Sequence, residues 1–252
     1  MDPIKKFNIQ KKNRIKSYNK SNLSNKANNF FKESIKSKYS YNFTYLGLPI
    51  IQYPQDIVKF QEIFWDVKPD LIIETGIAHG GSLNMSSSML ALLNYSDLVS
   101  NAKPIKRKLI GIDIDIRAHN LKRIKKSPYY HLMHLINKSS IAKDTIKEVK
   151  KISKKFKKIM VLLDSNHTHD HVLSELNAYA PLVSKNSYCI VYDTFIQELN
   201  NTYFKNRPWN ITNNPGTAVK KFLLKNKNFL LDKSINNQLL ISSAKNGYLK
   251  RK

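Results

Sequence analysis

The chain has 252 residues, of which 41% are hydrophobic, and a formal net charge of +25 at pH 7. This length suffices for one complete core in a single α/β domain of the larger kind. No apolar run reaches the ~18 residues of a membrane-spanning helix, and the first residues lack the apolar stretch of a secretory signal, which favours a cytoplasmic protein. The single cysteine, Cys189, lies inside an apolar run, which favours a buried thiol and excludes a disulfide framework within the chain.

The positive charge points to polyanions, such as nucleic acid, an anionic lipid surface or an acidic glycan. The lysines are nevertheless spread along the whole chain, and a bias toward Lys, Asn and Ile is what an AT-rich genome gives. Arg is scarce, whereas nucleic-acid readers commonly interleave Arg or aromatic residues with their basic residues. This distribution disfavours a nucleic-acid partner.

Residues 1–40 are rich in Lys, Asn and Ser and show no sustained apolar periodicity. They predict a basic polar leader that is flexible or loosely helical, in which 28–35 could form a short docking helix. Order is expected from residue 41 onward, so that 41–252 form the folded domain. Its first predicted helix covers 54–68, where apolar residues recur at helical spacing.

From residue 71 the chain alternates between apolar strand-like and amphipathic helix-like segments. The predicted strands are 71–75, 108–114, 129–136, 158–164 and 188–193, and the helices between them are 82–94, 117–124, 142–156 and 169–183. Such alternation predicts a parallel sheet with helices on both faces. After a helix over 218–226, the segments 228–235 and 238–244 predict two strands joined at Asn236-Asn237, which such a short link makes antiparallel.

Six blocks of sequence carry a resemblance to a known family. They are "YLGLPIIQYPQD", "PDLIIETGIAHGGS", "GIDID", "LLDSNHTHDHVLSELNAYAPLVSKNSYCIVYDT", "GTAVKKFL" and "GYLKR". In this order the blocks resemble the cephalosporin hydroxylase family, which includes rhamnosyl O-methyltransferases. The resemblance implies an α/β Rossmann-like methyltransferase fold, with a mainly parallel seven-stranded sheet, a C-terminal antiparallel hairpin and helices on both faces. It also implies S-adenosylmethionine (SAM) as cofactor and methyl transfer to a hydroxyl of a sugar or a sugar-containing small molecule.

The strand at 71–75 ends in Glu74-Thr75-Gly76, and a glycine-rich turn leads into the next helix. A strand, a glycine turn and a helix N-terminus are typical of a nucleotide-binding crevice, although such a turn can equally serve close strand–helix packing. The resemblance implies that this turn contacts the methionine part of SAM. The implied cofactor-binding residues are Glu74, Gly76, His79, Gly80, Gly81 and Ser82, and His79 could instead only cap the helix.

Two later strand ends supply the other implied contacts of the cofactor. Asp113 follows the second strand, where one carboxylate can accept hydrogen bonds from both hydroxyls of a ribose. Asp115 lies two residues further and is expected to cap the next helix. Ser139 and Ser140 follow the third strand, and the resemblance implies that they contact adenine.

The segment "VLLDSNHTHDHV" is the densest cluster of chemically active residues. Asp164 ends a strand, and His167, His169 and His171 follow at alternate positions. The spacing is close to the zinc motif of metallo-β-lactamase-like hydrolases, but one residue is missing and the glycine turn does not suit that fold. The resemblance implies instead that Asp164 and the acids after the fifth strand meet at the sheet edge and bind Mg²⁺, which prefers oxygen ligands.

The metal site departs from the family pattern at one position. Relatives carry a Glu-Asp pair after the fifth strand, and this chain has Tyr192 before Asp193. A phenol stays protonated near neutral pH, so Asp164 and Asp193 are the expected metal ligands and metal binding is in doubt.

His167 is the candidate general base, since imidazole titrates near neutral pH. The alternative is that it only orients Asp164, also a candidate catalytic residue. His171 is expected to support the site.

The loop 197–217, with Tyr203, Arg207 and Trp209, could line a sugar pocket, and the enzyme could be a homo-oligomer. Two other functions stay open: a hydroxylase that works with a partner protein, and a non-catalytic protein that binds RNA or glycan.

Overall fold

The computed structural model describes residues 1–252, apart from the side chain of Asn201. Its centre is a seven-stranded sheet with the order β5-β4-β3-β6-β7-β9-β8. The strands are β3 (Leu71–Thr75), β4 (Lys108–Asp113), β5 (Met133–Asn137), β6 (Ile159–Leu163), β7 (Tyr188–Val191), β8 (Phe229–Leu231) and β9 (Tyr248–Arg251). Strands β3 to β7 pair in parallel, whereas β9 runs antiparallel to both β7 and β8. The predicted fold class is confirmed.

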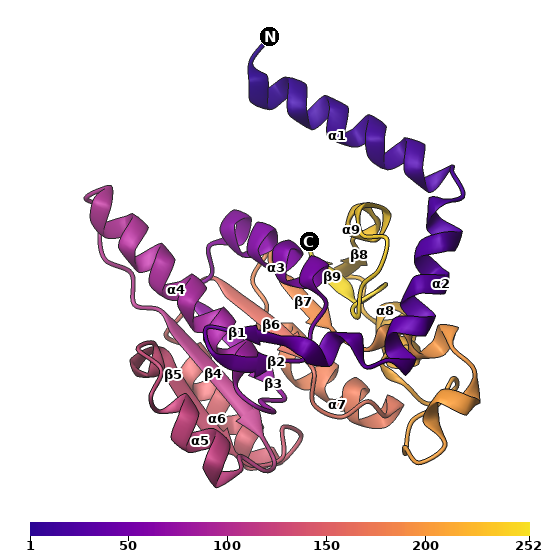
Figure 1. Cartoon of the computed structure of the whole chain (residues 1–252). Helices are drawn as coiled ribbons and strands as arrows, with labels where there is room; N and C mark the ends of the chain where they lie inside the picture. The colour runs from indigo at the N-terminus through magenta and orange to yellow at the C-terminus, as the bar shows by residue number, and fades with distance from the viewer.

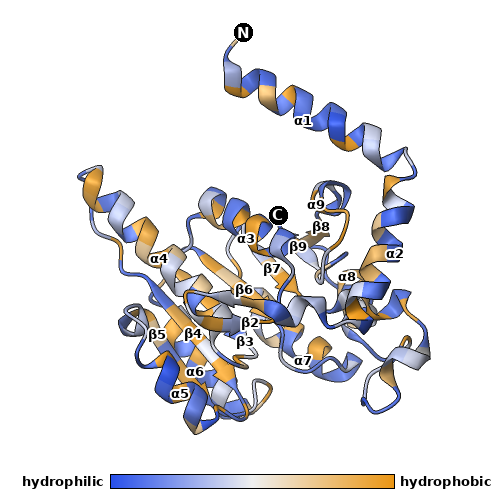
Figure 2. Ribbon diagram, viewed as in Figure 1, coloured by the Kyte–Doolittle hydropathy of each residue, from blue (hydrophilic) through white to orange (hydrophobic). Residues whose placement is uncertain are grey.

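Helices cover both faces of this sheet (Figure 1). One face packs against α3 (Pro54–Val67), α4 (Gly81–Val99), α5 (Ala118–Ile124) and α9 (Lys233–Gln238). The other packs against α6 (Lys143–Ser153), α7 (His169–Tyr179) and α8 (Pro215–Lys225). Alternate side chains of each strand enter opposite cores, as Ile72 and Ile73 do in β3. Because both faces are covered, the strands are continuously apolar rather than alternating, and Figure 2 shows them as hydrophobic segments inside polar helices.

The second strand of the terminal pair does not lie where the sequence predicts it. A strand over 238–244 is wrong, since α9 ends at Gln238 and an irregular segment then leads to β9. Ser242 Oγ and the Ser243 backbone nitrogen donate to the buried carboxylate of Asp56, at 2.6 Å and 2.7 Å. A buried charge needs such partners, so this segment solvates a carboxylate instead of joining a ladder.

The strand predicted over 228–235 is also shorter in the structure. It is reduced to β8 because Asp232 Oδ1 accepts a hydrogen bond from the Ser234 nitrogen at 3.0 Å and so caps α9. The antiparallel pair is therefore joined through a helix and a loop, not through Asn236-Asn237. The third parallel strand likewise begins later than predicted, because a 3-10 turn, η2 (Tyr130–Leu132), precedes it.

Residues 1–50 form two helices and a small two-stranded antiparallel sheet. These are α1 (Pro3–Asn19), α2 (Leu23–Lys36), β1 (Phe43–Tyr45) and β2 (Leu48–Ile50), with the 3-10 turn η1 (Tyr39–Asn42) between them. The remaining 3-10 turns are η3 (Ala180–Leu182), η4 (Thr194–Glu198) and η5 (Asn201–Phe204). Helix α1 buries none of its residues and extends away from the sheet (Figure 1), whereas α2 buries Phe31 and Ser34. The domain boundary at residue 40 stays a prediction.

Among the described residues, none of the helices has both the length and the apolar character needed to cross a membrane.

Candidate functional site

A cavity of about 440 Å³ lies at the carboxyl ends of β3, β6 and β7. This is the edge at which parallel α/β sheets bind their ligands, and the volume is in the range of small-molecule sites. One wall is the glycine turn and another is the sheet edge. Two further walls come from the end of α2 with η1 and from the segment around η5. The side chains that these last two walls contribute include Lys38, Tyr41, Tyr203, Phe204, Arg207 and Trp209.

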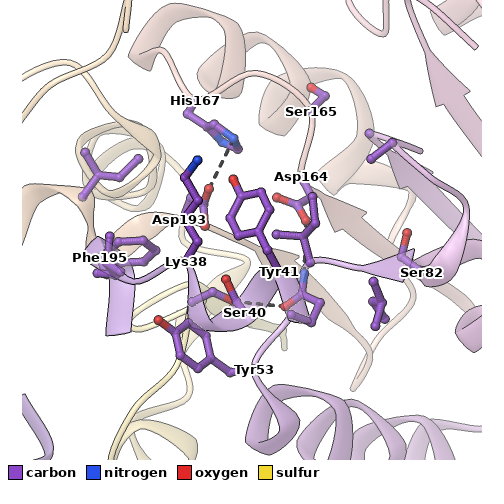
Figure 3. Close-up of a pocket in the computed structure, with 18 of the residues that line it drawn as sticks. Lys38, Ser40, Tyr41, Tyr53, Ser82, Asp164, Ser165, His167, Asp193 and Phe195 are labelled. Atoms are coloured by element: carbon purple, nitrogen blue, oxygen red, sulfur yellow. Dashed lines mark hydrogen bonds and ion pairs between the residues drawn. The ribbon is translucent and has the colours of Figure 1, made fainter. Parts of the chain in front are cut away.

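Asp164, His167 and Asp193 converge in this cavity (Figure 3). Asp164 follows β6 and Asp193 follows β7, which are neighbours in the sheet, and His167 lies in the loop before α7. One ligand atom from each residue lies within 4.8 Å of the other two. His167 Nε2 is 3.2 Å from Asp193 Oδ2, and the ring of Trp209 stands perpendicular to the imidazole at 4.7 Å. The structure thus brings together the three residues predicted as base and metal ligands.

The carboxylate of Asp164 is in an unfavourable place for a negative charge. Burial, and then the nearby charge of Asp193, raise its pKa well above the usual range. Its Oδ2 accepts a hydrogen bond of 3.1 Å from Gln52 Nε2. Two crowded carboxylates with a neighbouring imidazole form a donor set that suits a divalent cation, because the cation would offset their mutual repulsion.

Tyr192 does not take part in this cluster. It is only 5% exposed and packs in the core face that also contains Tyr188 and Ile190. Burial raises the pKa of its phenol well above the usual value, so it carries no charge. The cluster therefore has two carboxylates where the family pattern has three, and metal binding stays a prediction.

Backbone conformation or close packing explains each glycine of the turn. Gly76 and Gly80 have φ of +87° and +90°, which strongly favour glycine. A Cβ on Gly76 would lie 2.1 Å from the Asp164 carbonyl oxygen, and one on Gly81 would lie 2.3 Å from that of Pro49. Close packing therefore accounts for these glycines. Of the turn residues, Gly76, His79, Gly81 and Ser82 also line the cavity, and their contact with a cofactor stays a prediction.

Glu74 and Asp113 lie on two sides of this turn. Glu74 is 2% exposed, and its Oε2 accepts a hydrogen bond of 2.9 Å from Ser86 Oγ, while Oε1 has no partner in the described structure. Burial raises the pKa of Glu74 to about 7. Asp113 Oδ2 accepts from the Ile77 nitrogen at 2.8 Å, so this acid holds the backbone that lines the cavity. Neither carboxylate lines the cavity itself.

Asp115 does not cap the next helix as expected. The first residue before α5 is Arg117, which makes no side-chain cap. Asp115 is exposed, and its Oδ2 lies 3.5 Å from Arg117 Nε.

Ser139 and Ser140 lie outside the residues that line the cavity. Ser140 is buried, and its Oγ donates to Glu175 Oε1 at 2.6 Å. His171 Nε2 lies 3.1 Å from the same hydroxyl and 3.5 Å from Glu175 Oε1. This cluster stabilises the start of α7, and the contact with adenine stays a prediction.

The three histidines therefore have three different environments. His167 contacts Asp193, His169 Nδ1 lies 2.8 Å from Thr217 Oγ1, and His171 belongs to the cluster with Ser140. They do not converge on one point, which explains why the spacing resembles a zinc motif without making one.

Gln52 is a site residue that the sequence did not single out. Its amide nitrogen donates to Asp164, and its Oε1 lies 3.1 Å from Ser243 Oγ. Ser243 Oγ in turn lies 2.8 Å from Asp56 Oδ2, so a chain of polar groups runs from Asp164 to the buried Asp56. The only signal was its place in the block "IIQYPQD", because the partners are distant in sequence.

Comparison with known proteins gives the family. The family model for rhamnosyl O-methyltransferase/CmcI matches residues 37–252. Rhamnosyl O-methyltransferase from Mycobacterium bovis is 26% identical over 154 residues, which cover 61% of this chain and 57% of that protein. The same enzyme from Mycobacterium leprae is 26% identical over 152 residues, 60% of each chain. The chain thus matches little more than half the length of these relatives.

Two solved structures show the same fold. A CmcI structure with Mg and SAM gives a TM-score of 0.55 at 16% identity, and the match covers 84% of this chain and 77% of that one. An O-methyltransferase from Bacillus cereus with SAH gives 0.50 at 8% identity, covering 84% and 82%. The resemblance seen in the sequence blocks is confirmed, and the chain belongs to the rhamnosyl O-methyltransferase/CmcI family.

Proposed function

We propose that this protein is a SAM-dependent O-methyltransferase that acts on a hydroxyl of a sugar or a sugar-containing small molecule. The observation that carries the proposal is the convergence of Asp164, His167 and Asp193 beside the glycine turn in one cavity. Membership of the family supports it, as does the activity for which the mycobacterial relatives are named.

The turn from Gly76 to Ser82 is the proposed contact for SAM, which supplies an electrophilic methyl group. Glu74 is buried next to this turn, and the hydrogen bond that its Oε2 accepts from Ser86 ties β3 to α4, the helix that begins at the turn. Asp113 fixes the backbone of Ile77 and so keeps the turn in shape. These residues would align the methyl group with the acceptor oxygen, which is the main contribution an enzyme makes to such a displacement.

His167 is the proposed base for the acceptor hydroxyl. When its Nε2 donates to Asp193 Oδ2, Nδ1 is the nitrogen left to accept a proton. Asp193 would then hold the ring in place and stabilise the imidazolium that forms. Trp209 packs against the ring and limits the access of water.

Asp164 and Asp193, with His167 beside them, are the residues that would hold Mg²⁺. A bound divalent ion lowers the pKa of a hydroxyl that it coordinates. The two carboxylates position the acceptor oxygen near His167 in either case.

The test combines cofactor binding with methyl transfer. Calorimetry should show that purified protein binds S-adenosylhomocysteine, and labelled SAM should transfer its methyl group to methyl rhamnoside or a related glycoside. His167→Ala should lower kcat by about 10²- to 10⁴-fold, the usual worth of a general base, and leave S-adenosylhomocysteine affinity within about twofold. His119→Ala, at an exposed position on α5, is the matched control. Lack of binding at millimolar S-adenosylhomocysteine would overturn the proposal.

A homo-oligomeric state and a cytoplasmic location are further proposals that rest on the sequence and the family. Binding of RNA by the basic leader is the competing function. It predicts salt-sensitive RNA affinity that is lost without residues 1–40, whereas the enzyme proposal predicts methyl transfer.

A further inference from the structure

The cavity carries two cationic side chains that have no acidic partner. Lys38 and Arg207 both line it, and among the described side chains neither is within ion-pair distance of a carboxylate. Lys36, close to Lys38 in sequence, differs because it pairs with Glu33 at 2.7 Å. The acids that line the cavity are Asp164 and Asp193.

Arg207 is connected to the candidate base through one aromatic ring. Its guanidinium lies 5.1 Å from the centre of the Trp209 ring, and that ring contacts His167 at 4.7 Å. Aromatic residues provide flat apolar surfaces with specific contact geometry, and the cation–π contact holds Arg207 near this surface. Arg207 and His167 thus both contact the Trp209 ring inside the cavity.

Lys38 approaches the site from the leader. It follows α2 with a φ of +51°, in a turn held by hydrogen bonds from the Lys38 nitrogen to Ile35 and from the Tyr41 nitrogen to Lys38. Figure 3 shows its amino end pointing into the cavity on the side of His167 and Asp193. The apolar contact of Phe31 with Phe195, at 5.0 Å, anchors α2 and hence this turn.

We infer that the acceptor sugar carries an anionic group, in its simplest form a phosphate, which Arg207 and Lys38 bind while the reacting hydroxyl faces His167. This inference rests on the proposed function, which leaves the acceptor open. Arg presents a planar fork of donors that matches phosphate oxygens, and Lys adds a point charge. Lys38 and Arg207 are the Lys and Arg side chains among the residues that line the cavity, and they would offset the repulsion between a phosphate and the carboxylates of Asp164 and Asp193.

The experiment compares acceptors that differ in charge. Rhamnose 1-phosphate, a nucleoside diphosphate rhamnose and uncharged methyl rhamnoside are each titrated into the S-adenosylhomocysteine complex by calorimetry and assayed for methyl transfer. We expect at least about tenfold tighter binding of one or both phosphorylated sugars, as charge-assisted bonds would give. Tighter binding of rhamnose 1-phosphate would indicate an acceptor with a terminal phosphate. Tighter binding of the nucleoside diphosphate rhamnose would indicate an acceptor whose phosphates link the sugar to a nucleoside.

Charge-removing variants locate the phosphate. Arg207→Met and Lys38→Met should each weaken binding of the phosphorylated sugar by about tenfold, raise its KM and leave that of methyl rhamnoside within about twofold. Lys68→Met and Arg14→Met are matched controls, because Lys68 has the same positive φ and both side chains lie over aromatic rings outside the cavity. These controls should behave as wild type.

Equal affinity for charged and uncharged sugars would overturn the inference. So would Arg207→Met and Lys38→Met variants that lose as much affinity for methyl rhamnoside as for the phosphorylated sugar. Neither result would affect the proposal of methyl transfer itself. Failure of all three sugars to bind at millimolar concentration would also overturn it. A protein that binds the phosphate tightly but neither binds S-adenosylhomocysteine nor transfers methyl groups would instead refute the proposed function.

Discussion

Glu74 is a buried acid that weakens the folded state on its own. It has one hydrogen bond from Ser86 and one oxygen without a partner, in a site that is 2% exposed. Its pKa of about 7 lies above the usual value of 4.5. Between these values the unfolded chain has released a proton that the folded chain still holds, so the free energy of unfolding falls as the pH rises.

Replacement of Glu74 by Gln should therefore stabilise the free protein at high pH. We expect the Tm of wild type to fall between pH 5 and pH 8, and the Tm of Glu74→Gln to fall less, by an amount equivalent to at most about 3 kcal/mol. Buried Asp164 and Asp56 have raised pKa values as well, so the difference between the two proteins is the quantity to measure, by calorimetry at each pH. Glu33→Gln, at an exposed position, should follow wild type, and parallel pH profiles for all three proteins would contradict the argument.

The sequence predicts the position of a site residue well when that residue directly follows a strand. Asp164 and Asp193 come directly after neighbouring parallel strands, so topology alone brings them together. Gln52 was missed because its partner Asp164 is 112 residues away in sequence, and Lys38 because Asp164 and Asp193, which share its cavity, are more than a hundred residues away. Ser140 had the expected position, but its hydroxyl is bound to Glu175, a contact between two segments that no local pattern indicates.

At the scale of elements, α2 is the link between the leader and the site. Its residues Ala27, Phe31 and Ile35 recur every four positions and pack with Tyr53 and Phe195, as the apolar stripe of a docked helix should. Helix α1 has no such stripe in contact with the core. It is held by exposed or half-buried polar contacts such as Tyr18 to the Gln238 carbonyl at 2.5 Å.

Adjacent phenylalanines on α2 allow a matched test of this docking. Phe31 is 5% exposed and Phe30 is 51% exposed. Phe31→Ala should lower the free energy of unfolding by about 3 kcal/mol, as for other large-to-small core changes, and should raise the acceptor KM because the wall with Lys38 loosens. Phe30→Ala should stay within about 0.5 kcal/mol of wild type. Urea denaturation measures both, and similar losses for the two variants would mean that α2 is not docked.

Element type was easier to predict than pairing. Apolar runs bounded by turn residues located the five parallel strands, because such strands are covered on both faces. The segment 238–244 also contains a short apolar run, Leu239 to Ile241, yet it folds as a loop beside Asp56. Its alternative as a strand would remove the hydrogen bonds from Ser242 and Ser243 and leave the buried carboxylate with the Tyr248 hydroxyl as donor, a cost that only the three-dimensional contacts reveal.

On the scale of the whole molecule, repulsion among the many positive side chains lowers the stability of the folded state. The chain has 43 Lys and Arg against 18 Asp and Glu, and several of its ion pairs are exposed, as Lys138 with Asp144 is. Exposed pairs contribute little, whereas like charges on one domain oppose its compact state. Composition alone predicts this property, since it does not depend on the fold.

Salt should therefore stabilise the protein. The Tm should rise by several degrees between 20 mM and 300 mM NaCl, because the screening length falls from roughly 20 Å to below 10 Å over this range. Differential scanning fluorimetry in NaCl, KCl and LiCl gives the measurement, and the three salts should act alike if screening is the cause. A Tm that falls with salt would show that favourable ion pairs outweigh the repulsion.

Strand β9 lies between β7 and β8, although it follows both along the chain. During synthesis from the N-terminus, a nascent chain that has grown to residue 240 already contains every parallel strand, but the edge of β7 that faces away from β6 has no neighbour. An open apolar edge invites pairing with another molecule, and a sheet that must wait for an inner strand made late folds slowly. Quality control by chaperones would consequently matter most in the interval before residues 248–251 leave the ribosome.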